Sequence, residues 1–293
     1  MTAPRTEFID TDPHGAAGRR ARRGFLRDPL ALTGLILVAF TLLVAFVGPM
    51  VAPFAIDEAA GAPFAPPGGE SPLGTDFMGQ DVLSRLLHGG SSVVWSSLVA
   101  ALIGVIFGAA LGMIAGFRRG WLDEVLMRLS DVLLSLPTIV FVLLFVSGLG
   151  RSLWLLTLLI GISHIPQVAR VIRGATVEVA GREFVEQAQA VGASWPRILT
   201  VQIAPNIMST IAVEFGIRVV WSIVAMASLS MIGQGIAPPA ADWGLMVNEN
   251  RTGLTFQPTA VLAPVVMIAI YALGTNLLAE AYGRRVATKE GRR

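Results

Sequence analysis

Long apolar segments with few charges alternate with shorter polar connections along most of this chain. A helix that spans a bilayer needs about 20 consecutive, predominantly apolar residues, and each segment is close to that length. The pattern therefore predicts an all-α membrane protein with six transmembrane helices, and the even number of spans places both termini on one side. The six expected spans are residues 30–50, 93–117, 132–150, 152–169, 206–231 and 259–279.

The composition agrees with a membrane domain over residues 29–283. Of the 293 residues, 54% are hydrophobic and 14% are charged, whereas soluble domains carry about 25% charged residues. Residues 1–28 and 284–293 are polar and basic, so they are expected to form two tails, with no signal peptide before the first span. The longest connections between spans are an outer loop over 51–92 and a second loop over 170–205.

Positive charges are distributed very unevenly between the two sides of this expected bundle. Of the 22 lysines and arginines, 18 lie in the two tails, in the loop at 118–128 and in the loop at 170–205. The opposite side holds Arg85, Arg151 and Arg251, while Arg218 lies inside the fifth span. Because loops rich in Lys and Arg stay cytoplasmic, both termini and the 170–205 loop are expected in the cytoplasm.

The 170–205 loop contains a stretch that predicts two short helices joined by a sharp turn. Residues 182–191 are mostly good helix formers, and Gly192 lies where a helix commonly ends with a C′ glycine. Ser194 can cap a second helix with Pro196 in its first turn, and this helix is expected to stop before Pro205. On the first helix, one face is expected to carry Phe184, Ala188 and Val191, and Glu183, Glu186 and Gln187 lie away from it.

Two interpretations fit this pair of helices. It can rest on the membrane surface as an amphipathic element, or it can dock a separate protein. A resemblance favours docking: Glu186-Gln187-Ala188, followed by Gly192 and later by Pro205, is similar to the EAA loop of ATP-binding-cassette importer permeases. The departures from that loop pattern are Gln187, Gln202 and Ala204.

Further segments extend the resemblance over about residues 25–285. The outer-loop sequence PLGTDFMGQDVLSRL at 72–86 is similar, nearly residue for residue, to a segment of the dipeptide, oligopeptide and nickel permease subfamily, with Gln80 as the departure. Within it, Asp76 can cap a turn, and a helix is expected from Asp81 onward. The residues at 121–137 and at 233–244 also resemble that subfamily.

The resemblance implies the permease subunit of an ATP-binding-cassette importer in the bacterial inner membrane. Such a chain forms half of a translocation pathway for di- or oligopeptides, with nickel chelates, opines or glutathione as alternative solutes. The implied partners are a second homologous permease in a heterodimer, ATP-binding subunits, an extracytoplasmic solute-binding protein and the lipid bilayer. Coupling to the ATPase is implied for Glu183, Glu186, Gln187, Ala188, Gly192 and Pro205.

The residues favour no enzyme chemistry and no cofactor in this chain. A P-loop needs a lysine in its glycine-rich sequence, and the only lysine is Lys289, so ATP hydrolysis is assigned to other subunits. There is no cysteine, and His14, His88 and His164 are too scattered to hold a metal; His164 is interpreted as a hydrogen-bonded residue of the bundle. A membrane enzyme would need several catalytic groups at one depth, and a secondary transporter would favour an inverted repeat. We find neither, and we expect no nucleic-acid partner.

Glu214 and Arg218 interrupt the apolar character of the fifth span. Because they are four residues apart, they share a helix face and can pair. Ionisable groups at such a depth usually face the bundle interior or an aqueous path. Two interpretations stay open: the pair lines the translocation pathway together with Trp221 and holds the charged ends of a peptide-like cargo, or it is a structural ion pair that fixes this span to a neighbour.

Glycines and prolines predict special geometry in three of the spans. In the second span four glycines recur at every fourth position, so they share one helix face and allow another helix to approach closely. That face is either a moving seam or a static packing surface. Pro137 and Pro166 are expected to kink the third and fourth spans. The glycines are Gly104, Gly108, Gly112 and Gly116.

Overall fold

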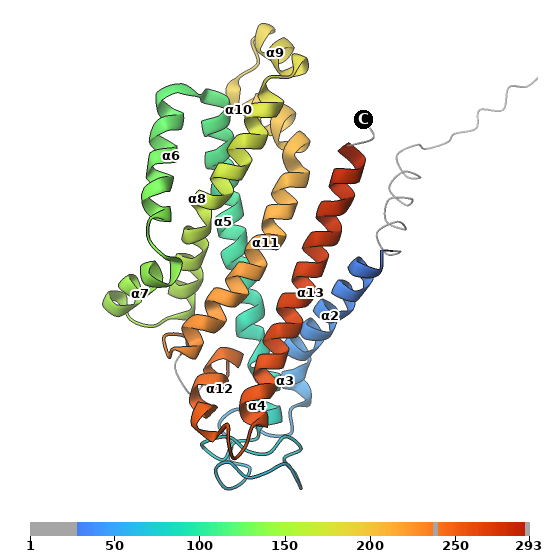
Figure 1. Ribbon diagram of the computed structural model, residues 1–293, viewed down its shortest axis with the longest axis vertical. Helices are drawn as coiled ribbons and strands as arrows, with labels where there is room; N and C mark the ends of the chain where they lie inside the picture. The colour runs from blue at the N-terminus through green and yellow to red at the C-terminus, as the bar shows by residue number, and fades with distance from the viewer. Residues whose placement is uncertain (1–27, 237–239, 291–293) are drawn as a thin grey trace, which may run out of the picture.

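The protein is a bundle of long helices that run between two ends of the molecule (Figure 1). The computed structural model describes residues 28–236 and 240–290, and within them it contains helices and isolated β-bridges but no strand. The expected tail over 1–28 therefore lies outside the described residues, apart from Asp28. In chain order the elements are α2 (Pro29–Phe46), α3 (Gly48–Val51), α4 (Val82–His88), α5 (Gly90–Arg118), α6 (Gly120–Leu134), α7 (Thr138–Leu149), α8 (Leu153–Ala180), α9 (Glu183–Ala190), α10 (Trp195–Arg197), the π-helix η1 (Ile198–Ile203), α11 (Ala204–Met231), α12 (Trp243–Asn250), the 3-10 helix η2 (Arg251–Gly253) and α13 (Thr259–Glu290).

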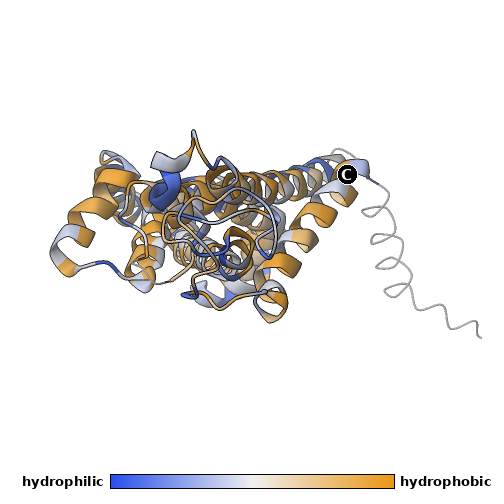
Figure 2. Cartoon of the chain, turned by 90° about the horizontal axis from the view of Figure 1, so that it is seen from below, coloured by the Kyte–Doolittle hydropathy of each residue, from blue (hydrophilic) through white to orange (hydrophobic). Residues whose placement is uncertain are grey.

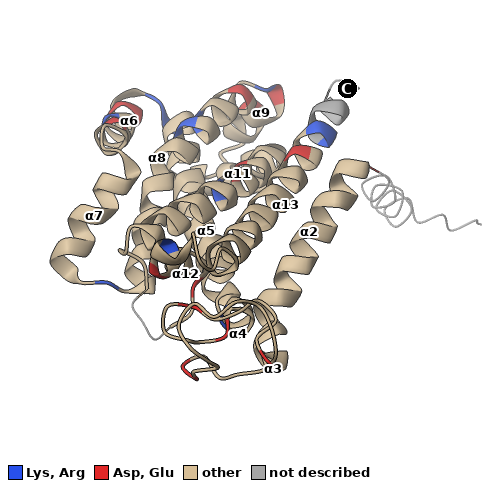
Figure 3. Ribbon diagram, turned by 60° about the horizontal axis from the view of Figure 1, so that its bottom comes forward, with Lys and Arg blue, Asp and Glu red and all other residues tan. Residues whose placement is uncertain are grey.

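Five helical segments of the described chain are long and apolar enough to cross a membrane, and there are six if the bent pair α6 and α7 is counted as one span. Figure 2 shows these helices mostly in hydrophobic colours, and Figure 3 shows charged residues gathered at the two ends of the bundle. α2 begins, and α13 ends, toward the end that carries α9. Two helices extend past their expected spans, α8 to Ala180 and α13 to Glu290, because hydropathy marks only the apolar part of a helix.

The expected third span over 132–150 is not one continuous helix. The chain forms α6 up to Leu134 and then α7 from Thr138, with a bend of 79° between them. Pro137 lies in the break with extended backbone, at a ψ of 133°. A proline disfavours helical backbone in the residue before it, which separates α6 from α7. The expected kink at Pro137 is thus a full change of direction, whereas Pro166 lies inside α8, which continues as one helix.

The glycine face of α5 packs directly against α8. A Cβ at Gly108 would lie 2.6 Å from the Cβ of Val168, and one at Gly112 would lie 2.5 Å from the carbonyl oxygen of Ala169. Gly104 and Gly116 meet α8 in the same way, at His164 and Thr176. The close helix approach predicted from the glycine spacing is therefore present along the whole length of this contact.

We expect Gly108→Ala to destabilise the bundle. The added methyl group would need α5 and α8 to separate, and overpacking of this kind typically costs about 1–3 kcal/mol. The matched control is Gly174→Ala on α8, where a Cβ meets nothing within 4 Å and the better helix propensity of alanine favours the folded state. Thermal unfolding in detergent should show a lower midpoint for the first variant only. Equal midpoints for the two variants would contradict the close packing.

The chain between α3 and α5 folds together with α12 into an outer cap, which we define as residues 52–89 and 240–258, at the end of the bundle opposite α9 (Figure 1). Arg85 lies at its centre and is only 2% exposed. Its Nη1 is 2.5 Å from Oδ2 of Asp76, and its Nη2 is 2.9 Å from Oε2 of Glu249. Burial raises the pKa of the Glu249 carboxyl, although the nearby Arg85 guanidinium lowers it. The cap is thus held by a buried cation shared between α4, the preceding loop and α12.

Side-chain caps shape the turns of this outer cap as the sequence predicts. Oδ1 of Asp76 accepts hydrogen bonds from the backbone N–H groups of Met78 and Gln80. Oδ2 of Asp81 accepts one from the N–H of Ser84 and so caps the first turn of α4. The expected helix from Asp81 onward is present, and it is mostly buried beneath the loop.

Candidate functional site

α9 lies at the end of the bundle opposite the outer cap and is followed by a sharp turn (Figure 1). The helix ends at Ala190, and Gly192 follows with a φ of +79°, a conformation that glycine adopts without strain. The N–H of Ala193 bonds to the carbonyl of Ala188 at 3.0 Å. This is the Schellman arrangement of a helix C-terminus, so the predicted helix and glycine turn are both present.

The inner face of α9 is anchored in the core of the bundle. Val185 is fully buried, in a hydrophobic core that also contains Ile198 and Ile203 and residues of α5 and α8. Phe184 and Ala188 pack against the same core, as their spacing predicts. The prediction for Val191 is wrong: its side chain is 83% exposed, because α9 ends before it and the turn carries it away. Val185 therefore ties α9 to the core that it shares with α5 and α8.

The outer face of α9 is polar and open. Glu183, Glu186 and Gln187 are all exposed, as expected for side chains that point away from the anchored face. Beside them, the guanidinium of Arg118, at the end of α5, lies 4.9 Å from the ring centroid of Trp195, a cation–π contact. The segment after the turn is thus tied to α5 while α9 presents its acidic face outward.

The second helix does not stop before Pro205 as expected. The helix that starts at Trp195 continues to Met231 through the π-turn η1, where the N–H of Ala204 bonds to the carbonyl of Leu199, five residues back. Pro205 falls in the first turn of α11, and a proline there needs no N–H partner. Pro205 therefore lies at the start of α11, so the expected coupling residues belong to two elements, α9 with its turn and α11.

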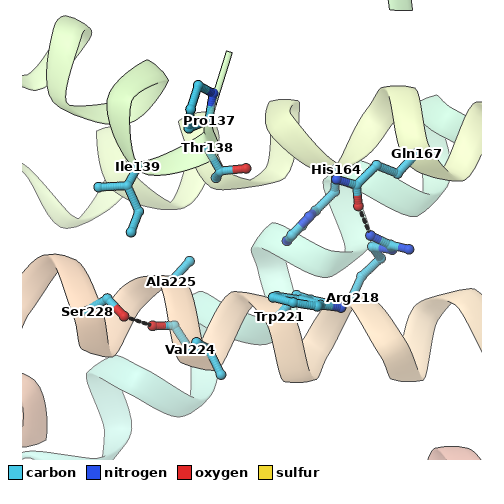
Figure 4. A pocket seen from close by; sticks show the side chains of 10 residues that line it. All are labelled: Pro137, Thr138, Ile139, His164, Gln167, Arg218, Trp221, Val224, Ala225 and Ser228. Carbon is cyan, nitrogen blue, oxygen red and sulfur yellow. Dashed lines mark hydrogen bonds between the residues drawn. The ribbon is translucent and has the colours of Figure 1, made fainter. Parts of the chain in front are cut away.

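A cavity of about 400 Å³ lies between α7, α8 and α11 (Figure 4). Ile139, Trp221 and Val224 line it and are themselves exposed, so the cavity opens at the surface of the bundle. Its polar lining residues are Thr138, His164, Gln167, Arg218 and Ser228.

Arg218 is the charged group of this cavity. Its Nε and Nη2 lie 3.1 and 3.0 Å from Oε2 of Glu214, as the four-residue spacing predicts, and its Nη1 donates to Oε1 of Gln167 on α8. Both partners of the ion pair are buried. Arg218 and Trp221 line the cavity, whereas Glu214 does not. The expected pathway residues are therefore split, with the cation facing the cavity and the anion behind it.

Comparison with known proteins identifies the family to which this helical bundle belongs. Residues 108–288 match the family described as binding-protein-dependent transport system inner membrane component. The chain belongs to this family. Residues 17–67 match the N-terminal TM domain of oligopeptide transport permease C. The protein is thus the permease subunit of an ATP-binding-cassette importer, a multi-pass protein of the bacterial inner membrane that works with ATPase and binding-protein partners.

The relatives of this permease match nearly its whole length. It is 32% identical over 260 residues to the glutathione transport system permease protein GsiD of Pectobacterium atrosepticum, covering 88% of this chain and 86% of the relative. It is 33% identical over 264 residues to GsiD of Escherichia coli O6:K15:H31, with the same coverage. Among solved structures, the inward-facing MetNI methionine ABC transporter matches with a TM-score of 0.54 at 16% identity, over 68% of this chain and 96% of that one, which shows a shared fold.

Several residues of the permease's cavity could not be found from the sequence. Gln167, Thr138 and Ser228 line it, and each is an ordinary polar residue in a mostly apolar segment. Gln167 follows Pro166 directly, and that polar position in the fourth span was the one available signal. His164 was interpreted as a hydrogen-bonded residue of the bundle, and its Nε2 indeed lies 2.9 Å from the hydroxyl of Ser222. Among the described residues there is no cluster of three groups that could hold a metal.

Proposed function

We propose that this permease forms half of the translocation pathway for di- or oligopeptides delivered by a solute-binding protein. The observation that carries the proposal is the match to glutathione transport permeases over 88% of the chain, since glutathione is itself a tripeptide. Nickel chelates, opines and, as a dedicated cargo in place of di- and oligopeptides, glutathione are the alternative solutes for the same machinery. The cavity between α7, α8 and α11 suits a peptide, because a buried cation lies beside exposed apolar side chains.

Energy enters through α9 in this proposal. The chain carries no P-loop sequence, so separate ATPase subunits bind and hydrolyse ATP. They dock on the face formed by Glu183, Glu186 and Gln187, while Ala188 packs behind that face against the core. The turn at Gly192 ends α9, and Pro205 contributes to coupling from the first turn of α11. When the ATPases close, α9 transmits the movement through Val185 to α5 and α8. This shifts the bundle between inward-open and outward-open states.

A second, homologous permease completes the pathway in this proposal, as a heterodimer. The cavity opens at the surface of the bundle beside Ile139, Trp221 and Val224, which are large apolar side chains left exposed in the single chain. A partner chain that covers this face would enclose the cavity between the two subunits. The outer cap then lies at the entrance, where a solute-binding protein docks.

ATP-driven uptake in proteoliposomes tests the proposed cargo. The full complex with its binding protein should accumulate radiolabelled dipeptide or glutathione when ATP is present, and it should accumulate none with a non-hydrolysable analogue. Nickel–histidine and an opine serve as parallel cargos in the same vesicles. Uptake of either of these with no uptake of any peptide would contradict the peptide assignment and leave the importer assignment intact.

A further inference from the structure

We propose that Arg218 binds a carboxylate of the cargo, and that this carboxylate replaces the side-chain amide of Gln167 on the guanidinium. The proposal rests on the proposed function, because it requires that peptide-like cargo passes this wall of the bundle. The proposed ligand group of this cavity is a free carboxylate, and Arg218 would select cargo that carries one.

The contacts of the Arg218 guanidinium leave its Nη1 side able to exchange Gln167 for another acceptor. Nε and Nη2 face Glu214 on the same helix, at 3.1 and 3.0 Å. Nη1 donates to Gln167, which is neutral and belongs to α8. A guanidinium has five N–H donors, and these contacts within the described chain engage one on each nitrogen, so the two terminal nitrogens each keep a second N–H. Glu214 thus positions Arg218, while its outer edge stays available for a planar acceptor.

The cavity around Arg218 favours an anion. Within the described residues no Asp or Glu lines it. The N-terminus of α7 contributes Thr138 and Ile139 to the wall, and Pro137 before it makes no side-chain cap. The first backbone N–H groups of a helix lack intrahelical partners and carry partial positive charge. Arg218 and the N-terminus of α7 therefore both contribute positive electrostatic potential to the cavity.

A carboxylate is a better partner for Arg218 than the amide that it displaces. Charge-assisted hydrogen bonds are about twice as strong as neutral ones, and a carboxylate can accept two parallel bonds from a guanidinium. The exposed rings and side chains of Trp221, Ile139 and Val224 give apolar contact to the rest of a small ligand. The cavity volume of about 400 Å³ lies within the usual range of about 300–1,000 Å³ for ligand pockets.

The test compares a free dipeptide with its C-terminal amide. Both are supplied as preloaded, saturating binding protein to proteoliposomes that contain the complete importer, and the initial uptake rates give a free-to-amide ratio. Two variants remove the site in different ways. Gln167→Glu places a permanent carboxylate on Arg218 with little change of shape. Glu214→Gln with Arg218→Gln removes both charges of the ion pair together, so this double variant leaves no buried charge unpaired. Arg128→Gln, at an exposed position of α6, is the control for loss of one positive charge.

The wild type and the Arg128→Gln control should prefer the free peptide by about tenfold, the equivalent of about 1.4 kcal/mol. Both cavity variants should bring the ratio close to one while the amount of assembled complex stays unchanged. Three results would overturn the proposed site. They are an unchanged ratio in either variant, an equal rate for the two peptides in the wild type, and loss of assembled complex in both variants. A wild type that transports neither peptide overturns the proposed cargo, and the site with it.

Discussion

Glu186→Arg is expected to reduce ATP-driven uptake strongly while leaving the permease folded in the membrane. Glu186 lies on the exposed face of α9, so the substitution should change the free energy of unfolding by no more than about 0.5 kcal/mol. At a docked interface, loss of a charged contact costs about 2–5 kcal/mol, which corresponds to more than about tenfold in affinity. Initial uptake rates in proteoliposomes should therefore fall at least about tenfold.

The matched control is Glu124→Arg. Glu124 is also an exposed acid near the α9 end of the bundle, on α6, where it faces Arg128 at 3.8 Å across one helical turn. The same charge reversal there should leave uptake within about twofold of the wild type, because exposed ion pairs contribute only about 0–1 kcal/mol. If the two variants lose uptake equally, the loss is caused by the change of net charge on this side of the protein. In that case α9 is not the docking site.

Arg85→Leu is expected to be the most destabilising single substitution in the outer cap. The guanidinium is buried between Asp76 and Glu249, and its removal leaves buried carboxylates without their counter-ion. Removing one partner of a buried ion pair typically costs about 3–5 kcal/mol. Because the cap joins the segment before α5 to the segment before α13, we expect a lower unfolding midpoint and faster proteolytic cleavage within residues 52–89.

Arg251→Leu separates this effect from a general loss of positive charge. Arg251 belongs to the same cap but is exposed in η2, so its replacement should move the unfolding midpoint very little. Cleavage rates and midpoints of the two variants should therefore differ clearly. An Arg85→Leu protein with the midpoint of the Arg251→Leu protein would show that the buried network does not hold the cap together.

The helices of this fold could be predicted from the sequence because the bilayer imposes strong local rules. Apolar runs of fixed length mark the spans, and the bias of arginines marks the cytoplasmic side. The break between α6 and α7 could not be placed, because the apolar run continues on both sides of Pro137 and conceals the change of direction. The continuity through Pro205 was also missed, since a π-turn that accommodates a proline has no signature in composition.

Some contacts of the candidate site depend on residues close in sequence, and others depend on how distant helices pack together. The turn at Gly192 and the pairing of Glu214 with Arg218 depend on residues close in sequence, and their geometry follows the predicted spacing. Gln167 meets Arg218 across 51 positions of sequence, and only the packing of α8 against α11 brings the two together. The burial of Arg85 likewise depends on α12, which is distant in sequence. The sequence therefore showed that Arg85 is charged, but it did not show that Arg85 is buried against Glu249.

Co-purification of ATPase activity with the permease tests the central claim that α9 couples transport to ATP. We would purify the permease from its native membrane in two forms, the wild type and the Glu186→Arg variant, and compare ATPase activity per folded permease. The wild type should carry the ATPase, and the variant, with an unchanged unfolding midpoint, should have lost it. A variant that retains the full wild-type activity would contradict the claim.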